Sequence, residues 1–367
     1  MEFPVKNKEK SDDSMKKLKI GLIGAGNIAN AHLEAYRQVP EAEIYAICDI
    51  NPERLSETAD RFGIERRYSS VGEMLAACPE LDAADVCVWN CNHAACAIEA
   101  LNAGLHVLCE KPMAYNAAEA EKMLAAAKKN DRLLMIGFVL RFSDDARIAE
   151  DIIRSGALGD IYYSEAQYVR RHGNPGGWFC NKALSGGGPI IDLGVHVIDL
   201  TRHLMGNPHP VSVYAVASDR VGRRPELKTN AGWMPKGASD ADLCDVEDFA
   251  SALIRYDNGA ATHLITSYDF NGEERARRAL YGTKGGLDLS NGVKLYTTTN
   301  GFLSDVDLKT ANYKEHREMF AAEMAHFVDC ALHGTPCLAK AEDGIVVMKI
   351  LDAIYESART GHEVLIK

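Results

Sequence analysis

The chain has 367 residues, 47% hydrophobic and 25% charged, which is enough for two compact domains with a sizeable buried core. Its 41 lysines and arginines against 52 aspartates and glutamates leave a net charge of −11, which argues against nucleic acid or an anionic membrane surface as the main partner. No apolar run approaches the length of a bilayer span and no signal-peptide core is visible, so no membrane anchor is expected. The ten cysteines are spread through apolar segments, which is typical of reduced thiols, and we expect a cytoplasmic protein.

The first half of the chain alternates short apolar strand patterns with helix patterns. Strands are expected at residues 18–23, 43–50, 68, 84–89, 106–109 and 133–138, and helices at 27–39, 52–62, 71–77, 93–103 and 117–130. This alternation predicts an α/β domain with a parallel sheet covered on both faces. We assign this α/β domain to residues 18–140, after a disordered lead-in over 1–17.

From residue 141 the pattern changes to longer strands that follow one another. A helix over 147–155, a strand over 161–170, a Gly- and Pro-rich loop over 173–188 and a helix over 189–205 come first. Strands are then expected at 211–217, 249–256, 260–268, 278–282 and 293–298, an exposed polar excursion at 220–241, and helices at 319–333 and 343–358. Consecutive strands predict an open, mainly antiparallel sheet. Residues 141–367 are therefore expected to form a second, α+β domain, to which the family resemblance described below assigns substrate binding and oligomerisation.

A glycine-rich turn follows the first strand. Gly24, Gly26 and Ala29 have the G-x-G-x-x-A spacing of a dinucleotide fingerprint, in which the glycines allow a tight turn and a close approach of the backbone to a pyrophosphate. Asp49 closes the next strand, where a carboxylate accepts hydrogen bonds from the ribose hydroxyls of adenosine and repels a 2′-phosphate. The pattern predicts NAD in preference to NADP, while Arg54 nearby leaves pairing with a phosphate open.

Five short motifs follow one another along the chain. They are Gly24-Ala25-Gly26, Glu110-Lys111-Pro112, GGGPIIDLGVH from Gly186 to His196, YGTKGG from Tyr281 to Gly286, and Glu342-Asp343-Gly344. In their order and spacing the chain resembles the Gfo/Idh/MocA oxidoreductases, the glucose–fructose oxidoreductase and inositol dehydrogenase group. The resemblance implies a Rossmann domain followed by an α/β domain whose open sheet serves oligomer contacts, in a homodimer or homotetramer. It also implies reversible hydride transfer between a nicotinamide and a hydroxyl of a sugar, cyclitol or sugar derivative.

Three residues are candidates for the chemistry. Oxidation of an alcohol needs a group that takes the hydroxyl proton as hydride leaves carbon. Asp192 and His196 are four residues apart on an expected helix and share a face, so the carboxylate can orient an imidazole that titrates near working pH. Lys111 follows the carboxyl end of a strand, and its ammonium can stabilise a developing alkoxide. The resemblance joins them into a Lys–Asp–His catalytic set in which Lys111 or His196 carries the proton; Asp199 is expected to be structural.

Further cofactor contacts follow from the resemblance. The family often has Thr-Pro-Asn-x-x-His after the fourth strand, and here Asn90 and His93 match while Val88 and Trp89 do not. Glu110 matches an acidic position beside the cofactor. The cofactor-binding residues expected are Gly24, Gly26, Asn27, Ile28, Asp49, Asn90, His93 and Glu110.

Substrate groups are expected from the loop that precedes the catalytic helix. Trp178 offers a ring face to a sugar, and Arg171 and His172 offer hydrogen-bond donors; a structural loop with a buried Trp178 is the alternative. Tyr168 and Lys182 are weaker candidates. No metal site is expected, because Cys87, Cys91, Cys96 and His93 lack the spacing of paired C-x-x-C knuckles or of a zinc helix.

Three functions remain open from the sequence. The leading one is an NAD-dependent dehydrogenase of a sugar or polyol. The second is a glycosidase that keeps NAD bound, oxidises the sugar transiently, eliminates the aglycone and reduces the product again, as some members of the family do. The third is a nucleotide-binding protein without chemistry, which the joint presence of Lys111, Asp192 and His196 disfavours.

Overall fold

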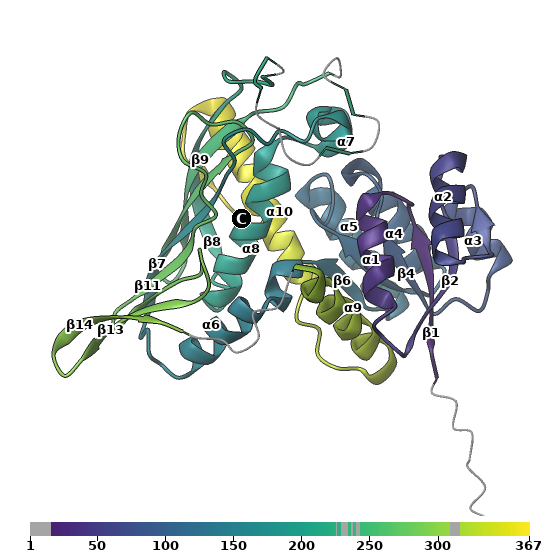
Figure 1. The fold of residues 1–367 in the computed structure, drawn as a ribbon, viewed down its shortest axis with the longest axis horizontal. Helices are drawn as coiled ribbons and strands as arrows, with labels where there is room; N and C mark the ends of the chain where they lie inside the picture. Colours follow the sequence, from purple (N-terminus) through teal and green to yellow (C-terminus); the bar gives the residue numbers. More distant parts are fainter. Residues whose placement is uncertain (1–15, 225, 229–233, 236–237, 240–242, 309–315) are drawn as a thin grey trace, which may run out of the picture.

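The computed structural model describes residues 16–224, 226–228, 234–235, 238–239, 243–308 and 316–367. Within these residues the chain forms two sheets that lie side by side, with helices between them (Figure 1). Most of the lead-in expected over 1–17, and part of the excursion expected over 220–241, lie outside the described residues. None of the described helices is long and apolar enough to cross a membrane.

The N-terminal sheet has six parallel strands in the order β3-β2-β1-β4-β5-β6, as the alternating pattern predicts. The strands are β1 (Leu18–Ile23), β2 (Ala42–Cys48), β3 (Arg67–Tyr68), β4 (Ala83–Val86), β5 (His106–Glu110) and β6 (Leu134–Gly137), and the helices are α1 (Asn27–Tyr36), α2 (Pro52–Phe62), α3 (Val71–Ala77), α4 (His93–Asn102) and α5 (Ala117–Asn130). β4 ends three residues earlier than expected, so residues 87–89 belong to the loop at the carboxyl edge of the sheet.

Side-chain caps explain where most of these helices begin. Asn51, Ser70 and Asn116 each accept the backbone N–H of the third residue that follows, at 3.0, 3.2 and 2.9 Å. No side chain caps α1 or α4, and the N-cap residue of α1 is Gly26. The first N–H groups of α1 follow a glycine-rich turn, where they can bind an anion.

The C-terminal sheet has nine strands in the order β14-β13-β12-β11-β7-β10-β9-β8-β15 and is mainly antiparallel. β7 and β10 pair in parallel. The helical connection after β7 brings the chain back, so that β8 runs in the same direction as β7. β9 is antiparallel to β8, and β10 is antiparallel to β9, so β10 again has the direction of β7. The strands are β7 (Ile161–Val169), β8 (Pro210–Ser218), β9 (Phe249–Tyr256), β10 (Ala261–Ser267), β11 (Arg278–Gly282), β12 (Gly286–Asp288), β13 (Lys294–Thr299), β14 (Phe302–Asp307) and β15 (Val364–Leu365). β12, β14 and β15 are short or polar and do not appear in the sequence prediction.

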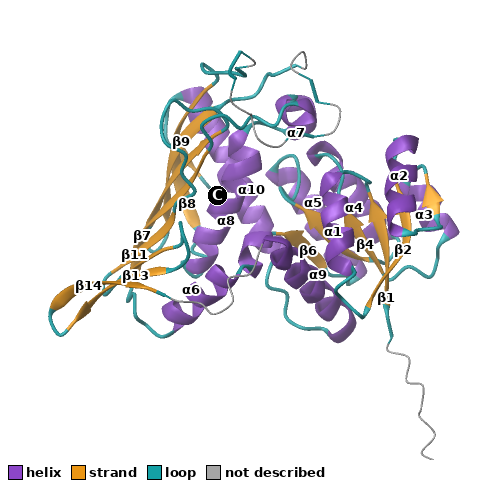
Figure 2. Ribbon diagram, viewed as in Figure 1, coloured by secondary structure: helices purple, strands orange, loops and turns teal. Residues whose placement is uncertain are grey.

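Helices fill the space between the two sheets and leave the outer face of the C-terminal sheet open (Figure 2). The helices of this half are α6 (Asp144–Arg154), α7 (Lys182–Ser185), α8 (Val195–Leu204), α9 (His316–His333) and α10 (Ala341–Thr360). α9 follows the second sheet in sequence but lies against α1 of the first, where the rings of His32 and Phe320 are 5.6 Å apart. Sequence order thus does not place α9 beside the strands that precede it.

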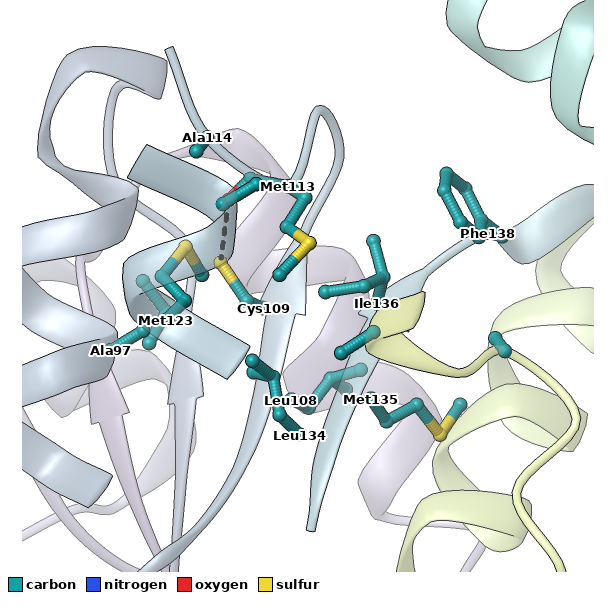
Figure 3. Close-up of a cluster of buried hydrophobic side chains, with 14 of the residues drawn as sticks. Ala97, Leu108, Cys109, Met113, Ala114, Met123, Leu134, Met135, Ile136 and Phe138 are labelled. Atoms are coloured by element: carbon teal, nitrogen blue, oxygen red, sulfur yellow. Dashed lines mark hydrogen bonds between the residues drawn. The ribbon is translucent and has the colours of Figure 1, made fainter. Parts of the chain in front are cut away.

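A buried apolar cluster supports the turn that follows β5 (Figure 3). Met113 lies in this turn, is 1% exposed, and accepts a weak hydrogen bond from the Cys109 thiol at its carbonyl, 3.9 Å away. Gly344 of α10 approaches so closely that a Cβ there would lie 2.7 Å from the sulfur of Met113. The closing Glu342-Asp343-Gly344 motif therefore packs on the turn that carries Lys111.

Candidate active site

The candidate site lies at the carboxyl ends of β1, β2, β4 and β5, the edge where open parallel sheets bind ligands. Gly24 has a φ of +100°, and a Cβ there would lie 2.5 Å from the carbonyl oxygen of Cys87, so the turn admits only glycine. Gly26 faces open space, with nothing among the described residues within 4 Å of a Cβ. Asn27 and Ile28 form the first turn of α1 directly behind it. The backbone here leaves room for a pyrophosphate beside a helix N-terminus.

Asp49 follows β2 and is held by the backbone on both sides. Its Oδ2 accepts the N–H of Ala25 at 2.7 Å, and its Oδ1 accepts the N–H of Asn51 at 2.6 Å. A carboxylate oxygen has two lone pairs, so each oxygen keeps one for a ribose hydroxyl. Because Ala25 belongs to the glycine-rich turn, this contact also sets the distance between the turn and the end of β2.

Lys111 and Asp192 come from the two halves of the chain and form an ion pair. Lys111 Nζ donates to Asp192 Oδ1 at 3.0 Å and to the Asp192 carbonyl at 3.2 Å, and the two side chains are only 16% and 12% exposed. The second carboxylate oxygen of Asp192 accepts the hydroxyl of Tyr268 at 3.0 Å. Tyr268 is fully buried directly after β10. Asp192, which precedes α8, therefore contacts the Rossmann domain through Lys111 and the C-terminal sheet through Tyr268.

The charges around Asp192 favour its ionised form. Burial by itself raises the pKa of Asp192, but the positive charges of Lys111, Arg170 and His196 and the hydrogen bond from Lys111 outweigh it, and the pKa lies below its ordinary value. Tyr168 and Arg170 are two residues apart at the end of β7 and so lie on the same face of the sheet. The Arg170 guanidinium is 5.3 Å from the centre of the Tyr168 ring. Sequence reasoning selected Arg171; Arg170 is the arginine whose charge reaches Asp192.

The expected helix over 189–205 begins as a π-helix. Residues Ile190–Gly194 have π geometry and continue into α8 at Val195. Glu247 holds the start of this segment, since its carboxylate accepts the N–H groups of Gly188 and Ile190 at 3.1 Å and the hydroxyl of Tyr355 at 3.0 Å. A Cβ on Gly188 would lie 2.1 Å from the Glu247 carbonyl oxygen, which explains the glycine there. Local π geometry is common at functional sites.

Asp199 lies one helical turn beyond His196 and is structural, as expected. Its two oxygens accept from Arg141 at 2.9 and 2.6 Å, and both side chains are buried. Arg141 also donates to Asp343 at 3.0 Å, and Asp343 accepts from Arg202 of α8 at 3.3 Å. This network joins α8 to α10 and so holds the helix that carries Asp192 and His196.

A second buried network lies beneath Lys111. Glu110 Oε2 accepts the N–H of Lys111 at 3.0 Å, and its Oε1 lies 3.1 Å from His32 Nε2. His32 Nδ1 is 2.8 Å from Asp85, so this imidazole bridges two carboxylates. Burial lowers the pKa of His32, but the charge of Asp85 and its hydrogen bond raise it well above the ordinary value. His32 is thus held as an imidazolium that orients Glu110.

Asn90 and His93 make contacts with the protein itself. Asn90 Nδ2 donates to the carbonyl of Ser185 at 2.7 Å, which ties the loop after β4 to α7. Both ring nitrogens of the buried His93 lie near backbone carbonyls, of Pro112 at 2.7 Å and of Val88 at 3.2 Å. Burial lowers the pKa of His93 despite these hydrogen bonds, so the ring is neutral near pH 7.

The candidate substrate residues lie on the loop after β7. His172 Nδ1 is 3.0 Å from the buried carboxylate of Asp269, which also accepts from Arg224 at 3.2 Å. Arg171 is exposed, and its backbone N–H donates to Glu274 at 3.2 Å. Trp178 is half-buried in a short 3₁₀ turn, Gly177–Cys180, with its ring 4.0 Å from that of Phe179. Part of the loop expected over 173–188 is therefore helical.

Four residues of this site were missed by sequence reasoning: Tyr268, Arg170, Glu247 and His32. Tyr268 and Glu247 lie far along the chain from the residues that they support, and no spacing rule connects them. Arg170 is two residues from Tyr168 along β7, and this spacing predicts that both side chains lie on one face of the sheet. His32 lies on the face of α1 that turns toward the sheet, but an isolated histidine in a helix gives no sign of two carboxylate partners.

The comparisons with known proteins agree with this geometry. Residues 18–138 match the model described as an oxidoreductase family with an NAD-binding Rossmann fold, and residues 146–288 match the Gfo/Idh/MocA C-terminal domain. The chain is 32% identical to the D-glucoside 3-dehydrogenase of Escherichia coli (strain K12) over 353 residues, 95% of this chain and 97% of that one. The chain belongs to the Gfo/Idh/MocA oxidoreductase family. The expected NAD-binding domain and oxidoreductase class are confirmed.

Other members of the Gfo/Idh/MocA family are similar over most of the chain. The myo-inositol 2-dehydrogenase of Thermotoga maritima is 26% identical over 342 residues, 89% of this chain and 92% of that one. A solved structure of levoglucosan dehydrogenase in complex with NADH and levoglucosan has a TM-score of 0.82 at 26% identity, and covers 96% of this chain and all of that one. This oxidoreductase thus has relatives that act on several sugars and a cyclitol.

Proposed function

We propose that this oxidoreductase is an NAD-dependent dehydrogenase of a secondary hydroxyl on a sugar, cyclitol or sugar derivative, with Lys111, Asp192 and His196 as its catalytic set. The observation that carries the proposal is the buried ion pair of Lys111 and Asp192 at the nucleotide-binding edge. Relatives named for D-glucoside, levoglucosan and myo-inositol support the substrate class.

The nucleotide edge fits NAD. The open space beside Gly26 and the uncapped start of α1 suit the pyrophosphate, with Asn27 and Ile28 in the first turn. Asp49 suits the adenosine ribose and repels the extra phosphate of NADP. We propose that Glu110, Asn90 and His93 shape the pocket on the side of the nicotinamide. When bound, NAD supplies the hydride acceptor.

Lys111 and His196 have different roles in the reaction. Lys111 is an ammonium paired with Asp192, so it has hydrogens to donate and no lone pair with which to take a proton. It is placed to stabilise negative charge that develops on a substrate oxygen. His196 lies close enough to lower the pKa of Asp192, although burial acts in the opposite direction, and we assign the proton to its imidazole. Asp192 accepts from Lys111 and lies near His196, so it can orient both side chains.

Polar and aromatic groups around this set suit a polyhydroxylated ring. We propose that Arg171, His172 and Trp178 contribute to substrate binding, together with Arg170, whose charge acts on Asp192, and Tyr168, whose ring lies beside the Arg170 guanidinium. A tryptophan face binds the C–H side of a sugar, while guanidinium and imidazole groups donate to its hydroxyls.

The test is formation of reduced nicotinamide with NAD and a panel of glucosides, anhydrosugars, aldoses and inositols. Lys111→Ala and His196→Ala are expected to lose at least ~100-fold in kcat while binding NAD as the wild type does. Lys349→Ala is the matched control, because Lys349 pairs with Glu121 at 3.1 Å on the surface. Undiminished turnover in Lys111→Ala would remove it from the mechanism. Glycoside cleavage without net reduction of NAD would instead establish the glycosidase cycle.

We also propose that the open face of the C-terminal sheet joins subunits into a homodimer or homotetramer. Tyr214 of β8 lies opposite Leu253 of β9, and both are exposed, as is Val216 two residues along β8. Such a contiguous apolar patch is typical of an interface. Light scattering should show an oligomer that Leu253→Glu dissociates and Leu243→Glu, an exposed leucine outside the sheet, does not; a monomeric wild type would contradict the proposal.

A further inference from the structure

A compact group of soft donor atoms lies far along the chain from the catalytic residues. His326 and Cys330 stand one turn apart on α9, and Cys337 follows in the loop before α10. The Nε2 of His326 and the two Sγ atoms all lie within 4.8 Å of one another, and the Nε2 to Cys330 Sγ distance is 3.3 Å. The site therefore gathers two thiols and one imidazole from two segments of chain.

His326 is in the tautomer that can bind a metal ion through Nε2. The backbone N–H of Leu338 donates to His326 Nε2 at 2.9 Å, so this nitrogen carries a lone pair and the proton sits on Nδ1. A tetrahedral zinc ion with bonds of about 2.3 Å to sulfur and about 2.0 Å to nitrogen holds such donors roughly 3.5–3.8 Å apart. The three atoms need to close by about an ångström or less to reach this geometry. Ligation replaces the hydrogen bond from the Leu338 N–H.

A second cluster shows why this one is preferred. His32, Asp85 and Cys87 also lie within 4.8 Å of one another, but both nitrogens of His32 already face the carboxylates Asp85 and Glu110. That cluster is fully buried, and an ion there would have to separate the imidazole from two carboxylates, whereas an ion at His326 displaces a backbone N–H. Two sulfurs and a nitrogen, in contrast, select zinc or another soft divalent ion over magnesium or calcium.

Solvent reaches the donor group from one side. Cys337 lines a surface cavity of about 270 Å³ together with Leu124, Lys128, Arg132 and Lys340. Of the three donors only Cys337 is among the residues that line this cavity, so an ion and the water molecule that completes its coordination would enter on the side of this thiol. His326 and Cys337 are half-buried, while Cys330 is buried, so the three donors span the boundary between the cavity and the interior.

The same loop ties the C-terminal segment to the Rossmann domain. After Cys337, the carbonyl of Leu338 accepts from Arg141 at 2.7 Å, and the carbonyl of Ala339 accepts the N–H of Ile136 in β6 at 3.0 Å. We propose that His326, Cys330 and Cys337 bind one zinc ion, with water as the fourth ligand, and that this ion fixes the end of α9 to the segment that borders β6. The proposal is independent of the dehydrogenase assignment.

The test uses the full chain, reduced and freed of metal by a chelator. Co²⁺ is added without oxygen and followed by its sulfur-to-cobalt charge-transfer band and visible d–d bands, and Zn²⁺ is titrated against a chromogenic chelator. One ion per chain is expected, with affinity lowered more than ~100-fold in Cys337→Ser and in His326→Gln. Cys96→Ser, a half-buried cysteine on α4, is the control and should bind as the wild type does. Circular dichroism checks that each variant is folded.

Two results would overturn the assignment. One is the absence of a sulfur-to-cobalt band in the reduced wild type, or the same band in folded Cys337→Ser and His326→Gln. The other is a reduced protein that binds no ion but loses two free thiols on mild peroxide treatment, which would identify Cys330 and Cys337 as a disulfide-forming pair. A zinc-dependent rise in Tm that a chelator reverses, and that His326→Gln lacks, would support the site by a measurement that does not depend on colour.

Discussion

Replacing Asp192 by Asn tests the site through its central charge. The change preserves shape but leaves the ammonium of Lys111 without its carboxylate partner 3.0 Å away. At that distance the Coulomb attraction is about 5 kcal/mol for an effective dielectric of 20. Breaking a buried pair typically costs about 3–5 kcal/mol, and the side chains here are 16% and 12% exposed, so we take about 3 kcal/mol. That figure is a cost in the free energy of folding. The loss in kcat/KM has a separate cause, the removal of the charge that orients Lys111 and His196, and we take it as about 100-fold, as for the loss of one electrostatic group in an active site.

The assay measures kcat/KM with the best sugar of the panel, and the binding of NAD by fluorescence. Asp192→Asn is expected to lose activity about 100-fold and to keep NAD binding, because Asp49 and the glycine turn are untouched. Asp151→Asn is the matched control: its pair with Arg154 has a similar distance, 2.8 Å, but both side chains are exposed, so activity should not change. A loss of less than about threefold in Asp192→Asn would refute the role assigned to the pair.

Three further predictions concern other parts of the molecule. Asp49→Ala should weaken NAD about tenfold while NADP is less affected, and an unchanged ratio of their Kd values would contradict the ribose assignment. Arg170→Gln should lower kcat/KM more than Arg171→Gln, because Arg170 acts on Asp192; equal effects would argue against this. Glu323 is fully buried, and neither of its carboxylate oxygens has a hydrogen-bond partner among the described residues. Burial and the negative charge of Glu110 raise the pKa of Glu323 well above its ordinary value. A raised pKa destabilises the fold as pH rises above the unfolded value, so Glu323→Gln should increase the free energy of unfolding more at pH 8 than at pH 5; denaturant titrations that show the same change at both pH values would refute it.

The nucleotide-binding half of this protein could be predicted from local sequence patterns. Strand and helix patterns over 18–138 predicted the six-stranded parallel sheet, because a strand buried on both faces reads as a continuous apolar run. The glycine turn and Asp49 lie at strand ends that meet at one edge, so local spacing was sufficient to place them together. The family motifs added Lys111, Asp192 and His196 in the same way, since each lies within a short conspicuous string.

The groups that surround these residues come from distant segments and could not be predicted from local patterns. Tyr268 reaches Asp192, and His32 reaches Glu110, across separations of 76 and 78 residues, which no helical or strand period encodes. The packing of α9 against α1 could not be predicted either, because an amphipathic pattern does not specify which apolar surface a helix covers. A side chain's charge state and partners depend on burial and on neighbours from other segments, and these exist only once the chain has folded.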